Sequence, residues 1–214
     1  MDQKTELQNK IVTAFCDECL WVRSIRTHFE VLFESGEKRH ELLAEVAKTF
    51  FSDLNLILID YLLLQQCKLT DPALSGKDKV NLTSNYILTL NWSHEIKILL
   101  NEANDHLMCY RRKIIDARRK VLAHIDLKTR LNLVDLGAFT EAEENSFWCE
   151  LQNFVNTAHN EVIGGPFEIN AAMPDGDAVS LVRGLINAVD YNDMVNQEPD
   201  FFIKRFQQQR YRNT

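Results

Sequence analysis

Apolar and small residues recur at steps of three and four through the first part of the chain, which is the spacing of an amphipathic helix. In the first segment they are Leu7, Ile11, Phe15, Cys19, Val22, Ile25, Phe29 and Leu32. A second segment, from about residue 38 to 67, repeats this spacing at Leu43, Val46, Phe50, Leu54, Ile57, Tyr61 and Leu64. Residues 56–59 are apolar all round, so we expect them to be the best-buried part of that helix.

Further helices are expected after a loop at residues 68–82. A short helix is predicted at residues 84–90. The stripe of the long helix that follows is Ile96, Leu100, Ala103, Leu107, Tyr110, Ile114, Ala117 and Val121. Thr140 and Glu143 then have the spacing of a capping box, which predicts that another helix begins there.

The distribution of glycine and proline also favours long helices. A last helix is expected at residues 177–195, and no segment alternates between polar and apolar residues as a strand does. Neither glycine nor proline occurs in residues 1–35, 37–71 or 77–136. The pattern predicts an all-α helical bundle with long antiparallel helices.

The charge of the chain is unevenly distributed. The formal net charge is −7, which is not typical of a protein coated with nucleic acid. Residues 111–130, however, contain eight basic and two acidic residues, whereas the rest of the chain contains 16 basic and 29 acidic ones. Such a local basic patch can hold one stretch of phosphodiester backbone, although a solvated helix face is the alternative interpretation.

Cysteine usage and hydropathy indicate the compartment. The five cysteines have no framework spacing, so we interpret them as reduced thiols. The first residues are polar and lack the hydrophobic region of a signal peptide. The most apolar run, residues 54–64, contains Asn55 and Asp60 and is too short to span a bilayer. We therefore expect a cytoplasmic protein with no membrane segment.

Familiar metal and catalytic motifs are incomplete in this sequence. His94-Glu95 is not followed by the second histidine of a zinc protease helix. Cys16 and Cys19 have the spacing of a zinc half-site, but no second pair completes it. Cys19 also lies on the first apolar stripe, so a packing role is the preferred interpretation. We predict neither a metal site nor a cofactor.

The remaining candidate for chemistry is the segment 118–126, Arg-Arg-Lys-Val-Leu-Ala-His-Ile-Asp. RNA can be cut without a metal if one group moves protons while cations stabilise the phosphate. Histidine suits the first task because its pKa lies near neutrality. Arginine suits the second because it stays charged and binds phosphate oxygens in pairs. The segment thus predicts phosphodiester cleavage, with neighbouring basic residues holding the RNA backbone.

Helix geometry selects Arg118 rather than Arg119 as the partner of His124. At about 100° per residue, Arg118 and His124 lie roughly 40° and 80° to either side of Ile114, whereas Arg119 points about 140° away. Arg118 and His124 are still about 120° apart, so one straight helix does not bring them to one phosphate. Either the helix ends or bends before His124, or two copies pool their motifs across a two-fold axis. The alternative is that His124 is a core or helix-end histidine without chemistry.

The string from Ala117 to Asp126, followed by Lys128 and Thr129, resembles the signature of the HEPN superfamily, an arginine followed within two helical turns by histidine. More narrowly, it resembles the abortive-infection U-type HEPN-like proteins, with their Arg-x-Lys-x-x-Ala-His-x-Asp pattern. The resemblance implies an all-α domain that often dimerises, metal-independent RNA cleavage in active members, and roles in phage defence or toxin action. It implies that Arg118 and His124 are the motif arginine and histidine, while Arg119 departs from the usual polar Asn or Asp.

We therefore predict a HEPN-like helical domain at residues 1–165 and a C-terminal helical extension with a basic tail at 166–214. The predicted function is a metal-independent endoribonuclease of a defence or toxin system, with His124 and Arg118 catalytic. Expected partners are RNA, a second copy forming a composite active site, and a neutralising or activating protein. The alternatives are a catalytically inactive module that binds RNA or a protein partner, and a structural adaptor with His124 buried. The residues predicted to bind substrate are Arg119, Lys120, Asp126 and Lys128.

Overall fold

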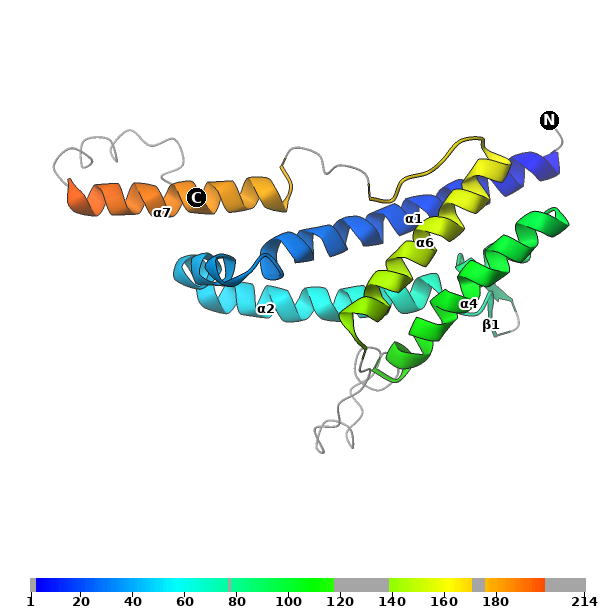
Figure 1. Ribbon diagram of the computed structural model, residues 1–214, viewed down its shortest axis with the longest axis horizontal. Helices are drawn as coiled ribbons and strands as arrows, with labels where there is room; N and C mark the ends of the chain where they lie inside the picture. The colour runs from blue at the N-terminus through cyan, green and yellow to red at the C-terminus, as the bar shows by residue number, and fades with distance from the viewer. Residues whose placement is uncertain (1–2, 77, 118–138, 171–175, 199–214) are drawn as a thin grey trace. The chain divides into compact units, whose positions relative to one another are not determined.

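The computed structural model describes residues 3–76, 78–117, 139–170 and 176–198 (Figure 1). Within these ranges the chain forms six helices and a single ladder of two short strands. The prediction of an all-α protein is therefore confirmed. Among the described helices, none combines the length and the apolar character that a bilayer crossing needs.

The helices correspond closely to the predicted ones. They are α1 (Gln3–Phe33), α2 (Glu37–Leu69), α3 (Ser84–Ile87), α4 (His94–Ala117), α6 (Glu141–Val162) and α7 (Ala178–Gln197). The expected loop after α2 contains β1 (Leu74–Ser75) and β2 (Lys79–Val80), which pair antiparallel. Two-residue strands are too short to show a period of two, so the sequence pattern did not predict this ladder.

The chain divides into two compact units. The first consists of residues 1–27 and 56–172, and the second of residues 28–55 and 173–214. The predicted boundary between residues 165 and 166 is a different kind of division, based on family resemblance, and it stays a prediction.

The core of the first unit lies where α4 packs antiparallel against α6, and α6 also contacts α1. Along α4 the buried stripe contains Leu100, Leu107 and Ile114, as the three/four spacing predicted. Phe15 of α1 meets Phe154 of α6 edge to face, with ring centroids 5.8 Å apart, and both side chains are fully buried. Burying large apolar side chains from three helices at one place is the main source of stability in such a bundle.

The prediction for the apolar face of α2 is confirmed at Leu43, which is buried, but it was wrong for the middle of the helix. Residues expected to be buried are exposed, at fractions of 40% for Val46, 61% for Phe50, 65% for Leu56, 61% for Ile57 and 38% for Ile59. The buried face is offset by about one residue, because Phe51 and Leu62 are buried instead of Phe50 and Tyr61. Spacing did not separate the two faces, because α2 is apolar on neighbouring sides and is interrupted at Ala47, whose torsions (φ −161°, ψ 70°) are not helical.

The start of α6 has the capping box that the sequence predicted. The Thr140 hydroxyl accepts a hydrogen bond from the Glu143 backbone N–H at 3.3 Å, and the Glu143 carboxylate accepts one from the Thr140 N–H at 2.9 Å. Both bonds satisfy backbone donors that have no partner inside the helix.

Thr140→Ala is expected to lower the free energy of unfolding by about 1 kcal/mol, because it removes the N-cap acceptor of α6. Urea denaturation followed by circular dichroism measures this change. Thr157→Ala is the matched control, because the Thr157 hydroxyl bonds only to a carbonyl of the preceding turn, that of Asn153. A loss for Thr140→Ala no larger than that for Thr157→Ala contradicts the capping role.

In the second unit, the end of α1 turns into α2 at Gly36, which has a positive φ of 90°. Arg39 donates to the carbonyl of Val31, and the His40 ring lies 2.7 Å from the carbonyl of Phe33. These side chains satisfy carbonyls at the C-terminal end of α1. The helix predicted at residues 177–195 is confirmed as α7, and Asp177 caps it by accepting from the Ser180 N–H at 3.0 Å.

Candidate functional site

All six predicted site residues lie outside the described residues, within the segment 118–138. They are Arg118, Arg119, Lys120, His124, Asp126 and Lys128. Their roles stay predictions. The structure describes the helices on either side of this segment. These flanking parts, called the frame below, are the last turns of α4 and the first turn of α6.

Both ends of the motif segment belong to the same end of the α4–α6 pair. Near the end of α4, Lys113 pairs with Glu143 in the first turn of α6. The Tyr110 ring packs edge to face against Phe139, with centroids 5.1 Å apart, and Ile114 is buried beside them. The end of α4 and the start of α6 thus lie at the same end of the helix pair (Figure 1), and these side-chain contacts connect them.

The Lys113–Glu143 pair also affects the charge at this site. The hydrogen bond from the Lys113 ammonium, helped by the Thr140 backbone N–H, lowers the pKa of the Glu143 carboxyl. Glu143 is therefore ionised at neutral pH and offsets one positive charge at the end of α4.

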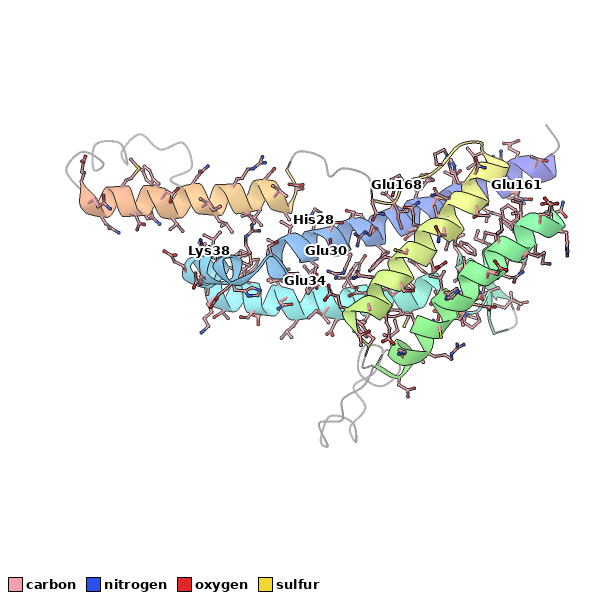
Figure 2. The ribbon with its side chains drawn as sticks, in the orientation of Figure 1. His28, Glu30, Glu34, Lys38, Glu161 and Glu168 are labelled. Atoms are coloured by element: carbon pink, nitrogen blue, oxygen red, sulfur yellow. The ribbon has the colours of Figure 1, made fainter. Side chains whose placement is uncertain are left out.

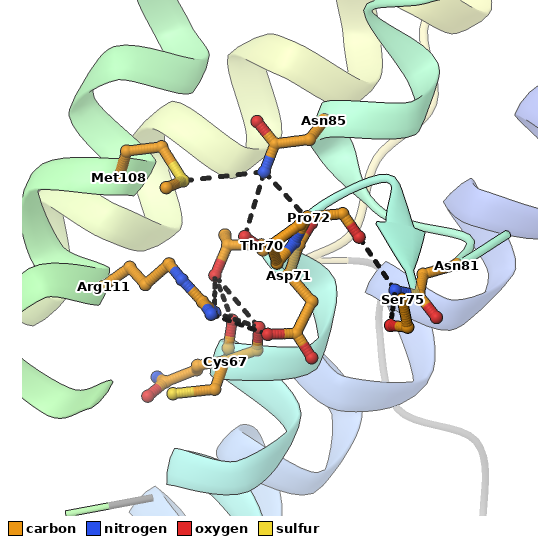
Figure 3. Close-up of polar contacts among 10 residues, drawn as sticks. Cys67, Thr70, Asp71, Pro72, Ser75, Asn81, Asn85, Met108 and Arg111 are labelled. Carbon is orange, nitrogen blue, oxygen red and sulfur yellow. Dashed lines mark hydrogen bonds and ion pairs between the residues drawn. The ribbon is translucent and has the colours of Figure 1, made fainter. Parts of the chain in front are cut away.

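Arg111 ties α4 to the C-terminal end of α2. Its Nη1 donates to the Cys67 carbonyl at 2.6 Å and to Thr70 Oγ1 at 3.3 Å, while Nη2 pairs with Asp71 Oδ1 at 2.6 Å (Figure 3). Asn85 of α3 donates to the carbonyls of Thr70 and Asp71 at 3.0 and 3.1 Å. The last carbonyls of a helix lack partners within it and carry partial negative charge, so a buried guanidinium suits this position.

This contact corrects the interpretation of the basic patch. Arg111 is 7% exposed and belongs to the fold, although the count of basic residues in segment 111–130 included it. Lys113 is paired with Glu143, whereas Arg112 is exposed. The last turns of α4 therefore supply less positive surface to a substrate than the charge count predicted.

A buried polar network joins α1, α2, α4 and α6 next to this site. Arg26 Nε lies 3.0 Å from Glu144 Oε1, which also accepts from Gln66 Nε2 and Trp148 Nε1, each at 3.4 Å. Tyr110 donates its hydroxyl to Gln66 Oε1 at 3.3 Å. Burial raises the pKa of Tyr110 well above its usual value, helped by the negative charge of Glu144, so the phenol stays protonated as a donor.

The positions of two members of this network in the sequence indicate that they are buried. Arg26 lies at a stripe position between Val22 and Phe29, and Gln66 lies between Leu62 and Leu69. A polar residue within an apolar stripe is buried and needs a partner. The spacing does not say which residue on another helix that partner is.

The cysteines of the zinc half-site fit the predicted packing role. Cys16 and Cys19 are both fully buried. Burial, together with the negative charge of Asp17, raises the pKa of Cys16 to about 12. Within the described ranges, no three His, Cys, Asp or Glu side chains lie close enough to hold a metal ion.

Two other histidines contact backbone carbonyls at helix ends. His40 contacts a helix-end carbonyl, and the His159 ring lies 2.8 Å from the Gly165 carbonyl after α6. His106 lines a polar groove of about 440 Å³ between α4 and α6, together with Glu102 and Glu150.

The fold and the frame define an all-α bundle with an Arg/His segment between two antiparallel helices. In comparisons with known proteins, the model of the HEPN family AbiU2 matches residues 4–181. The chain belongs to the AbiU2 family of HEPN proteins, and it is an HEPN module of the abortive-infection, defence-related kind. Neither the comparison with curated proteins nor that with solved structures found a match.

Proposed function

We propose that the protein is a metal-independent endoribonuclease of a cytoplasmic defence or toxin system. The observation that carries this proposal is the family match over residues 4–181, which includes the segment with Arg118 and His124. The contacts that hold the end of α4 to the start of α6, the helices before and after that segment, support it further.

In the proposed reaction, the ribose 2′-hydroxyl attacks the adjacent phosphorus and the bond to the 5′-oxygen breaks. His124 accepts the proton of the hydroxyl or delivers one to the leaving oxygen. Arg118 stabilises the additional charge on the phosphate. The products are a 2′,3′-cyclic phosphate and a 5′-hydroxyl. The residues assigned to substrate binding are Arg119, Lys120, Asp126 and Lys128.

We further propose that the active form is a homodimer. Arg118 and His124 lie about 120° apart on a straight helix, so two copies that pool their motifs across a two-fold axis would bring both side chains to one phosphate. Because such a nuclease is toxic to its own cell, a protein partner would either neutralise it until it is needed or activate it only on demand.

The test is to incubate the purified protein and its His124→Ala variant with structured and single-stranded RNA in excess EDTA, and to map the ends of the products. We expect cleavage that survives EDTA, leaves cyclic phosphates, and falls by about 10²–10⁴-fold in the variant. Cleavage that His124→Ala leaves intact refutes the assignment of the histidine. RNA binding without cleavage favours the catalytically inactive module.

A further inference from the structure

A hollow of about 340 Å³ opens on the first unit beside α6. It is lined by Arg23, Asn145, Trp148, Cys149, Gln152, Asn153 and Asn170. Four of these side chains are carboxamides, one is a guanidinium, and none is a carboxylate, although the chain as a whole carries a net charge of −7. The composition of this lining is therefore unlike that of the acidic chain around it.

One side of the hollow is held in place by its own contacts. The guanidinium carbon of Arg23 lies 5.3 Å from the centroid of the Trp148 ring, and Arg23 Nε donates to Asn170 Oδ1 at 2.6 Å. Glu168 Oε1 in turn accepts from the backbone and side-chain nitrogens of Asn170, both at 3.1 Å; Figure 2 labels Glu168 in the loop after α6. The planar cation and the amide are thus preorganised.

Gln152 attaches the loop after α6 to the helix itself. Its Nε2 donates to the Phe167 carbonyl at 2.7 Å, and its Oε1 accepts from the Ile169 N–H at 2.9 Å. The Ile169 side chain is buried. Gln152 thus binds both a carbonyl and an N–H group of the loop backbone. The loop that carries Asn170 is therefore held against α6.

The other side of the hollow is formed by α6. Asn145, Cys149 and Asn153 follow one another at four-residue steps, which places them on one face, and all three are exposed. Within the described part of the chain, the Asn145 side chain forms no hydrogen bond. Asn153 Nδ2 reaches Glu150 only at 3.5 Å, which leaves its Oδ1 available. Two carboxamides are therefore free to bind a ligand.

We infer that this hollow binds unpaired nucleobases of the RNA, with Asn145 and Asn153, about 12 Å apart along α6, each reading the edge of one base; the inference rests on the proposed function. A carboxamide presents a donor and an acceptor side by side, which matches the neighbouring donor and acceptor on a base edge. Single-stranded RNA is recognised by such contacts and by stacking on arginine planes. The volume lies within the range of small-ligand sites, and no lining carboxylate repels the flanking phosphates.

The experiment measures RNA binding in the His124→Ala full-length protein, so that the RNA stays intact. The probes are fluorescent single-stranded oligoribonucleotides of one base each and an abasic chain of equal length, compared by anisotropy. We expect at least one base to bind more tightly than the abasic chain. Asn145→Ala combined with Asn153→Ala should weaken that binding about tenfold and leave the abasic chain unaffected. Asn101→Ala, an exposed amide of α4 outside the hollow, is the matched control.

Equal affinity for base-bearing and abasic chains overturns the inference, as does a double variant that binds every probe like the His124→Ala parent. Failure to bind RNA at all overturns both this inference and the proposed function. The native protein could fail to cleave RNA while the double asparagine variant still loses base-dependent binding. That result supports the base-binding hollow and refutes the proposed nuclease activity. Both substituted side chains are exposed, and circular dichroism checks that the fold is retained.

Discussion

A heterodimer of one Arg118→Ala chain and one His124→Ala chain is expected to regain about half of the native cleavage rate, although each variant alone is inactive. If each active site takes its arginine from one copy and its histidine from the other, the heterodimer contains one complete site of two. Each homodimer contains none, and its rate should fall by about 10²–10⁴-fold.

The measurement uses two affinity tags on co-expressed variants, so that only the heterodimer is purified and assayed in EDTA. The control is a heterodimer of one native chain and one chain that carries both Arg118→Ala and His124→Ala. Neither composite site of this heterodimer is complete. If each chain instead builds its own site, the control is active and the mixed-variant heterodimer is not. That outcome would reject the composite site while leaving the nuclease assignment intact.

Arg26→Met is expected to lower the free energy of unfolding by about 3–5 kcal/mol, because it leaves the Glu144 carboxylate unpaired inside the protein. The Arg26 and Glu144 side chains are only 5% and 15% exposed. Since a whole domain is stable by about 5–15 kcal/mol, this loss is a large fraction of the total. Urea denaturation at low temperature measures it.

Two variants make this result specific. Adding Glu144→Gln to Arg26→Met removes the unpaired charge and should recover part of the stability, so the two effects are not additive. Lys10→Met breaks an ion pair with Glu6 whose side chains are 70% and 60% exposed, and it should cost less than about 1 kcal/mol. Equal losses for Arg26→Met and Lys10→Met would falsify the view that burial makes the Arg26 pair important.

Local patterns in the sequence determined most of the secondary structure. The stripe from Leu100 to Ile114 is buried as expected, because one helix face is apolar and its neighbours are not. The start of α6 was equally readable, since Thr140 and Glu143 bond to each other within one turn. The family was recognisable from the segment 118–126 because a short motif of chemically distinctive residues does not depend on packing.

Only the tertiary structure decided which face of α2 is buried and which side chains contact its C-terminal end. The spacing favoured Phe50 over its neighbour Phe51, but packing buries Phe51 and leaves Phe50 exposed. In the sequence, Arg111 is one of several cations in a basic segment. In the structure, it pairs with Asp71 just after the end of α2. The hollow beside α6 likewise joins Arg23 to Asn170, which are distant in the chain. Periodicity specifies which residues share a face of one helix, whereas the partner of a buried charge depends on contacts between helices.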